Sequence, residues 1–380
     1  MPIRKCTALP CMLVAALWSL SGLGCSARSR LITAILDAPA LRGNTIGLSS
    51  RQTVRLYLPP SYRVSQQRYP VLYFLPGYDD PLYIFTAGQL QGFRLRDAMD
   101  RLLAQGRIEE MIVVLPSSTT PLGGTFYSDS PVLGNWEEYV SRELVAFVDG
   151  NFRTLARPGA RAIAGTTAGG SGALLLAMRH PDVFGAVYAL DPVLLYPGAL
   201  AERGLCSKEE AGQFLTLQEA WSALPEPQAR LQRTLYLQAS LGSSSEAEHL
   251  RAFFIAMGAA FSPDPGRPGM PIRLPYRRTP AGLTPDPSAQ AAFDAGLGGW
   301  EEKVARYGAN LRQLKLLALD YGTDTGIRWL PEGSARAAAI FSAAGIPHRL
   351  LAHAGDQENQ FRERMERFLL PIVSEVLHAQ

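Results

Sequence analysis

The chain has 380 residues, of which 47% are hydrophobic and 19% are charged, and its formal net charge at pH 7 is +3. This composition excludes an intrinsically disordered chain, because such chains combine low hydrophobicity with high net charge. A net charge close to zero gives no electrostatic reason to expect nucleic acid as a partner. The length predicts one large globular domain or two ordinary ones.

The N-terminal segment has the pattern of a secretory signal. Two basic residues precede an apolar stretch at 11–18, and small residues follow up to Cys25. We therefore expect residues 1–24 to be a signal peptide and the protein to be exported. Two processing routes remain open. Lipidation of Cys25 would give a cell-envelope lipoprotein tethered to the membrane, whereas cleavage after Ala27 would give a secreted protein.

Cysteine and histidine spacing gives no sign of a disulfide framework or a metal site. Cys206 is the only cysteine that follows Cys25 in the sequence, and the five histidines are not spaced as zinc ligands usually are. We therefore expect neither a metal nor any other cofactor.

Short apolar runs alternate with helical patterns along most of the chain. The predicted strands are residues 52–58, 71–75, 111–115, 162–164, 186–190, 315–319 and 348–352. The predicted helices are residues 93–104, 136–148, 168–178, 334–344 and 361–377. Buried strands that alternate with helices predict an α/β protein with a mostly parallel central sheet and helices on both faces.

This alternation is interrupted from about residue 192 to about residue 312. The segment contains helical patches and a run rich in proline and glycine at 262–287, and no strand is predicted in it. Long insertions between the strands of such a sheet commonly cover a binding site. We expect a single domain over residues 31–380 that carries this segment as a helical lid.

Several motifs occur in a fixed order between residues 123 and 191. They are GGTFYSDSP at 123–131, GNWE at 134–137, RT at 153–154, GTTAGG at 165–170 and AMRHPDVF at 177–184. The chain resembles the esterase D family of α/β-hydrolases, which includes formylglutathione hydrolases, feruloyl-type esterases and mycolyltransferases. The resemblance covers most of residues 50–375 and is weakest across the lid. It implies an α/β-hydrolase fold and a Ser-Asp-His triad.

The nucleophile of this family lies in a G-x-S-x-G turn, and here the matching turn is GTTAG at 165–169, so that the nucleophile position is Thr167. Threonine keeps a hydroxyl, but its β-methyl group crowds a strained turn and limits χ1. The resemblance places the oxyanion donors at the backbone N–H groups of Tyr78 and Ala168. Because backbone donors survive side-chain replacement, we expect an oxyanion pocket to persist.

The other two triad positions also lack the residue that the family has. The acid position falls on Thr325, and Asp324 stands one residue earlier, where a local shift could make it a substitute. The histidine position falls on Gln357, whose amide cannot act as a general base. His353 is expected to be a strand residue rather than a replacement base.

Further polar residues near these motifs have a functional and a structural interpretation. Asp79 and Asp80 follow the oxyanion loop and could contact a ligand or a cation, although a solvated turn is the simpler interpretation. His180 is expected to pack in a turn, and His249 in the lid is not expected to act in catalysis.

Two functions of different classes remain open. Three replaced triad positions within well-matching flanks favour an exported, catalytically inactive esterase relative that binds a small-molecule, acyl or ester ligand, or acts as a scaffold. The alternative is a carboxylic-ester hydrolase or acyltransferase that uses Thr167 as an atypical nucleophile, because the hydroxyl, the turn and the backbone donors survive.

Overall fold

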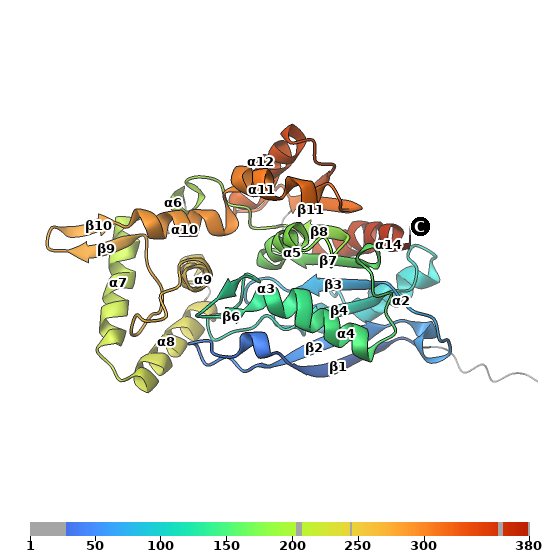
Figure 1. The fold of residues 1–380 in the computed structure, drawn as a ribbon, viewed down its shortest axis with the longest axis horizontal. Coiled ribbons are helices and arrows are strands. Elements are labelled where there is room, and N and C mark those ends of the chain that lie inside the picture. Colours follow the sequence, from blue (N-terminus) through green and yellow to red (C-terminus); the bar gives the residue numbers. More distant parts are fainter. Residues whose placement is uncertain (1–27, 203–206, 244, 356–359, 379–380) are drawn as a thin grey trace, which may run out of the picture.

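The computed structural model describes residues 28–202, 207–243, 245–355 and 360–378. An eight-stranded sheet in the order β1-β2-β4-β3-β7-β8-β11-β12 forms its centre, with helices on both faces (Figure 1). The strands of this sheet are β1 (Arg30–Asp37), β2 (Arg51–Leu58), β3 (Val71–Leu75), β4 (Ile112–Pro116), β7 (Arg161–Thr166), β8 (Ala186–Leu190), β11 (Leu316–Gly322) and β12 (Arg349–His353).

The sheet is mostly parallel, as the sequence predicts. β1 pairs antiparallel with β2 and β2 with β4, whereas all the pairs from β4 to β12 are parallel. The sequence pattern did not predict β1. This strand lies at the edge of the sheet, its side chains are largely solvent-accessible, and its sequence RLITAILD lacks the alternation that identifies a half-buried strand.

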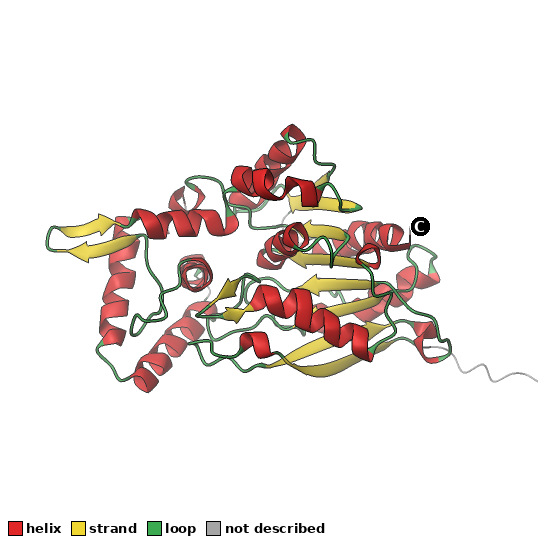
Figure 2. Cartoon of the chain, in the orientation of Figure 1, coloured by secondary structure: helices red, strands yellow, loops and turns green. Residues whose placement is uncertain are grey.

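The two faces of the sheet carry separate hydrophobic cores, because successive side chains of a strand point to opposite sides. In β3, Leu72 and Phe74 belong to one core, whereas Val71, Tyr73 and Leu75 belong to the other. Figure 2 shows the helices that cover these faces. They are α1 (Ile84–Ala87), α2 (Leu95–Ala104), α13 (Phe361–Arg364) and α14 (Leu370–His378) over the first core. The second core is covered by α3 (Trp136–Glu138), α4 (Val145–Asn151), α5 (Ala168–Arg179), α11 (Trp300–Leu311) and α12 (Trp329–Ala343).

Two predicted helices contain a π-helical stretch. The predicted helix at 136–148 is continuous from α3 through Tyr139–Leu144 to α4. The predicted C-terminal helix runs from α13 through Met365–Leu369 to α14. None of the helices in the described part of the chain combines the length and the apolar character that crossing a membrane requires.

The segment between β8 and β11 forms the insertion that the sequence predicts as a lid. It contains α6 (Ala199–Glu202), α7 (Lys208–Ser222), α8 (Glu226–Leu241), α9 (Glu246–Phe261), β9 (Tyr276–Thr279), β10 (Gly282–Pro285) and α10 (Pro287–Leu297). The expectation of no strand in it is wrong, because β9 and β10 pair as a hairpin. The side chains of these two strands are largely exposed and do not alternate between apolar and polar residues. The sequence therefore carries no strand signal here.

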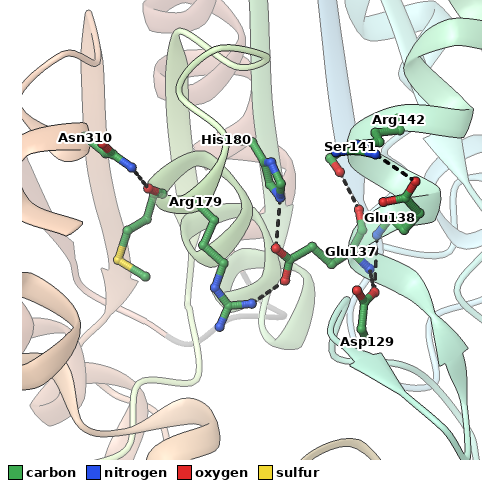
Figure 3. Close-up of polar contacts among 9 residues, drawn as sticks. Asp129, Glu137, Glu138, Ser141, Arg142, Arg179, His180 and Asn310 are labelled. Carbon is green, nitrogen blue, oxygen red and sulfur yellow. Dashed lines mark hydrogen bonds and ion pairs between the residues drawn. The ribbon is translucent and has the colours of Figure 1, made fainter. Parts of the chain in front are cut away.

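Aromatic packing attaches the insertion to the sheet through α9. The ring of Phe253 lies 5.3 Å from both Tyr78 and Phe126 and 6.3 Å from Trp329, measured between centroids. At the end of the predicted lid, α11 packs on α5, and the amide of Asn310 donates to the carbonyl of Met178 at 3.0 Å (Figure 3). α11 is therefore one of the helices that cover the sheet.

Candidate active site

The turn between β7 and α5 has the geometry of a nucleophile turn. Thr167 has φ 48° and ψ −116°, which is a strained conformation for a β-branched residue. The turn depends on two glycines. A Cβ on Gly165 would lie 2.4 Å from the carbonyl carbon of Gly169, and a Cβ on Gly169 would lie 2.2 Å from the carbonyl oxygen of Leu75. The strain therefore falls on the predicted nucleophile position.

The hydroxyl of Thr167 lies against the loop that follows β3. A Cβ on Gly77 would lie 2.2 Å from Thr167 Oγ1 and 2.6 Å from Asp80 Oδ2, so that only glycine leaves room for both atoms. The N–H group of Gly77 donates a hydrogen bond to Asp80 Oδ2 at 2.8 Å. The Thr167 hydroxyl and a carboxylate oxygen of Asp80 therefore both lie against the same side of Gly77.

A cavity of about 300 Å³ opens beside Thr167. Tyr78 and Ala168, the two predicted oxyanion residues, line it together with Thr167, Asp79 and Asp80. The opposite wall comes from α9 and the start of α12, through the side chains of His249, Phe253, Trp329 and Leu330. Among the described residues that line this cavity there is no lysine or arginine.

The two aspartates that line the cavity differ in their exposure to solvent. Asp79 remains exposed and has a φ of 59°, whereas Asp80 is partly buried. Desolvation raises the pKa of the Asp79 carboxyl, and the nearby His249 opposes this shift. Asp79 and Asp80 are therefore more than a solvated turn, because both line the cavity. His249, for which the sequence predicted no role, shares their cavity.

Two tyrosines hold the loop that carries these carboxylates. Tyr78 donates its hydroxyl to the carbonyl of Leu122 at 2.9 Å, and Tyr127 donates to the carbonyl of Pro76 at 2.7 Å. Burial raises the pKa of Tyr78 well above its usual range, so this phenol stays a neutral donor. The backbone around the expected oxyanion donor is thus fixed from two directions.

The predicted acid positions lie outside the cavity lining. Asp324 is exposed, and its carboxylate accepts hydrogen bonds from the N–H of Gly355 at 2.7 Å and from Thr323 Oγ1 at 3.1 Å. Thr325 Oγ1 accepts from the N–H of Ile327 at 3.1 Å. These bonds shape the loop after β11 and connect it to the segment after β12.

Two other predicted positions, Gln357 and Cys25, lie outside the described residues. His353 is the last residue of β12, as expected from the sequence. Among the described residues, no group of three or more histidine, cysteine or acidic side chains could hold a metal ion.

A buried charge network lies at the ends of β8 and β11, and no sequence pattern predicts it. Arg364, which is fully buried, pairs with Asp191 and with Asp320, both at 2.6 Å. Tyr188 donates to Asp320, and His353 Nε2 lies 3.2 Å from the same carboxylate. Burial raises the pKa of Asp191, and the charge of Arg364 opposes that shift. Arg364 and Asp191 are too distant in sequence for any local pattern to reveal the pair.

The motifs that carry the family resemblance form structural contacts (Figure 3). His180 Nε2 donates to the Glu137 carboxylate at 2.9 Å, and Arg179 pairs with the same carboxylate. Although desolvation opposes it, these two partners hold the pKa of Glu137 below its usual value. Asp129 accepts from the N–H groups of Glu137 and Glu138. His180 therefore fixes the end of α5 to α3, which agrees with its expected place in a turn.

In sequence, this chain is similar to known esterases. A family model described as "Putative esterase" matches residues 46–252. The chain is 34% identical over 143 residues to an endo-1,4-beta-xylanase/feruloyl esterase of Xylanibacter ruminicola, which is 35% of this chain and 18% of that protein. It is 32% identical over 145 residues to Esterase Rv1288 of Mycobacterium tuberculosis, which is 37% of this chain and 28% of that protein. The chain thus spans less than a third of the length of these relatives.

Solved structures show the same fold at low sequence identity. A ferulic acid esterase matches 92% of this chain and 99% of its own, with a TM-score of 0.57 and 20% identity. The fluorophosphonate-binding serine hydrolase FphF of Staphylococcus aureus matches 93% of this chain and 100% of its own, with a TM-score of 0.52 and 13% identity. The architecture is that of the α/β-hydrolase esterases.

Proposed function

Because the chain belongs to the esterase family whose model covers residues 46–252, we propose that it is an exported esterase relative that binds an acyl or ester ligand beside Thr167 without turning it over. The observation that carries this proposal is the carboxylate of Asp80 next to the Thr167 hydroxyl. The relatives and their printed activities supply the class of ligand.

A carboxylate at this point opposes ester chemistry. Attack on an ester places negative charge on the carbonyl oxygen close to the nucleophile, and esterases stabilise that charge with N–H donors. Here the Asp80 carboxylate accepts a hydrogen bond from the N–H of Gly77, and its negative charge when ionised would repel a second negative charge. The β-methyl group of Thr167 adds crowding at the same place.

The walls of the cavity indicate which ligands it accepts. Phe253, Trp329 and Leu250 supply an apolar surface, and Asp79 and Asp80 supply negative charge without a lining lysine or arginine among the described residues. Such a site favours a neutral or cationic ligand with an apolar body and disfavours a carboxylate. The volume of about 300 Å³ suits a small aryl or short acyl group.

A matched series of ligands tests this binding role. Three alkylbenzenes of one shape, carrying an amide, an amine or a carboxylate, are titrated into the purified protein by calorimetry. We expect the amide and the amine to bind and the carboxylate to bind at least about tenfold more weakly. Trp329→Ala should weaken binding of the amide and the amine, whereas a variant of the exposed Leu231, which does not line the cavity, should not. Equal affinity for the carboxylate would contradict the proposed ligand class.

A second candidate function is ester hydrolysis or acyl transfer with Thr167 as nucleophile. The observation that favours it is the strained backbone of Thr167, because such strain costs on the order of 1–3 kcal/mol and a purely binding site has no use for it. The imidazole of His249 in the same cavity is a group that could accept a proton. Intact-mass detection of an acyl adduct on the wild-type protein, absent from Thr167→Ala, would establish this function.

A further inference from the structure

A second cavity, of about 430 Å³, lies between the sheet and the insertion and shares no lining residue with the cavity at Thr167. Asn44, Thr45 and Gly47 line it from the loop between β1 and β2. The insertion contributes Glu226, Arg230 and Arg233 from α8, and Arg267 from the loop after α9. Among the described residues that line this cavity there are therefore three arginines and one carboxylate.

The most informative of these side chains is Arg233, because it is only 3% exposed. One guanidinium nitrogen donates to the carbonyl of Gly269, and another lies 3.8 Å from Glu226 Oε1. Desolvation lowers the pKa of Arg233, the negative charge of Glu226 opposes this shift, and the positive charge of Arg230 adds to it. Burying a cation is costly unless acceptors surround it, so a further anionic group here would be stabilising.

The carboxylate of Glu226 is shared and only loosely held. Its Oε1 lies 3.6 Å from Arg230 Nε and 3.8 Å from Arg233 Nη2, both longer than a hydrogen bond, and its side chain is 52% exposed. Arg267 is directed by other partners, since it donates to Gln218 at 2.9 Å and pairs with Asp264 at 3.2 Å. The cavity therefore retains an excess of positive charge around Arg230 and Arg233.

The loop on the sheet side completes the site. A Cβ on Gly47 would lie 3.0 Å from Arg230 Nη1, and the φ of 76° at this residue also favours glycine. Thr45 lines the cavity from the same loop, but its Oγ1 is buried away from solvent. Asn44 bonds the carbonyls of Leu41 and Leu48, which fixes the loop in place.

We propose that this cavity binds a phosphate group, with the guanidinium groups of Arg230 and Arg233 as its ligands. The planar guanidinium fork matches the oxygens of a phosphate and forms paired charge-assisted hydrogen bonds with it. Free phosphate and the phosphate headgroup of a lipid present the same chemistry. This site is independent of the function proposed for the cavity at Thr167.

Calorimetric titration of the full-length protein with inorganic phosphate, in chloride buffer of constant ionic strength, tests the site. Arg230 is about half exposed, so Arg230→Gln should fold normally, and we expect it to weaken phosphate binding about tenfold or more. The matched control is Arg278→Gln in the hairpin, where an exposed arginine pairs with Glu219 at 2.8 Å, and it should bind as the wild type does. Thermal unfolding in chloride alone verifies that both variants are folded.

Vesicle binding separates the two sources of phosphate. Phosphatidylcholine vesicles with and without phosphatidic acid are sedimented with wild-type and Arg230→Gln protein. Binding that requires both phosphatidic acid and Arg230 supports a lipid headgroup, whereas binding of inorganic phosphate without vesicle binding supports a free phosphate. The proposal is wrong if the wild type binds neither at phosphate concentrations up to about 10 mM, or if Arg230→Gln binds both as the wild type does.

Discussion

The turn after β7 and the loop after β11 differ in what holds them in place. At the turn, the strained backbone of Thr167 depends on close approaches that only glycine allows at Gly165 and Gly169. At the loop, Asp320 of β11 is buried against Arg364, and the exposed Asp324 accepts a hydrogen bond from the N–H of Gly355. The turn therefore depends on the absence of two side chains, whereas the loop depends on a buried charge pair and on exposed hydrogen bonds.

The largest expected effect comes from breaking the buried network under the loop. Arg364→Met leaves Asp191 and Asp320 without their cation, and removing one partner of a buried pair costs about 3–5 kcal/mol of the free energy of unfolding. Urea denaturation measures the loss. Arg367→Gln, which removes an exposed pair with Glu363, is the control and should change stability little. A loss below about 1 kcal/mol for Arg364→Met would contradict the structural role of the network.

A second substitution probes the turn itself. Gly169→Ala places a Cβ 2.2 Å from the carbonyl oxygen of Leu75, so the turn must shift, at a cost of about 1–3 kcal/mol or more. Gly150→Ala is the control, because a Cβ there meets nothing within 4 Å, and it should be neutral or slightly stabilising. Thermal unfolding of the two variants measures this cost. Equal melting temperatures would show that the turn does not require the close approach of Gly169 to Leu75.

The carboxylate beside Thr167 allows a smaller but sharper test. If Asp80 repels the developing oxyanion, Asp80→Asn combined with Thr167→Ser should hydrolyse p-nitrophenyl acetate roughly tenfold faster than Thr167→Ser alone. The reverse order of rates would indicate that Asp80 accepts the proton of the hydroxyl. Asp324→Asn in the same background is the control and should leave the rate unchanged.

The smallest expected effect concerns pH. The pKa of Asp79 is raised above its ordinary value of 3.8, so the folded state holds this proton more tightly than the unfolded state. The resulting stabilisation is present below 3.8 and is lost as the pH rises through the raised pKa. Unfolding curves across this range should therefore show a decline in the wild type that is weaker in Asp79→Asn. If the stability of Asp79→Asn declined with pH as that of the wild type does, Asp79 would be excluded as the source of the decline.

Much of the frame could be predicted from the sequence, because it rests on local patterns. The apolar run of β3 and the glycines around Thr167 identify a buried strand and a sharp turn without any knowledge of distant residues. The strand β1 and the hairpin of β9 and β10 were missed, since edge and exposed strands lack a periodic apolar signal.

The parts of the sites that could not be predicted depend on long-range contacts. His249 reaches the cavity at Thr167 only because α9 packs on Tyr78 through Phe253. Arg233 becomes a buried cation only because α8 meets the loop around Gly269. These contacts are set by tertiary packing, and no spacing in the sequence predicts them.

The measurement that tests the central claim most directly is the hydrolysis of p-nitrophenyl esters, from short to long acyl chains, by the wild-type protein beside Thr167→Ala. We expect the same low background for both proteins, because Asp80 and the β-methyl group disfavour attack by the Thr167 hydroxyl. Turnover in the wild type that is lost in Thr167→Ala would contradict it and make Thr167 the nucleophile of an active esterase.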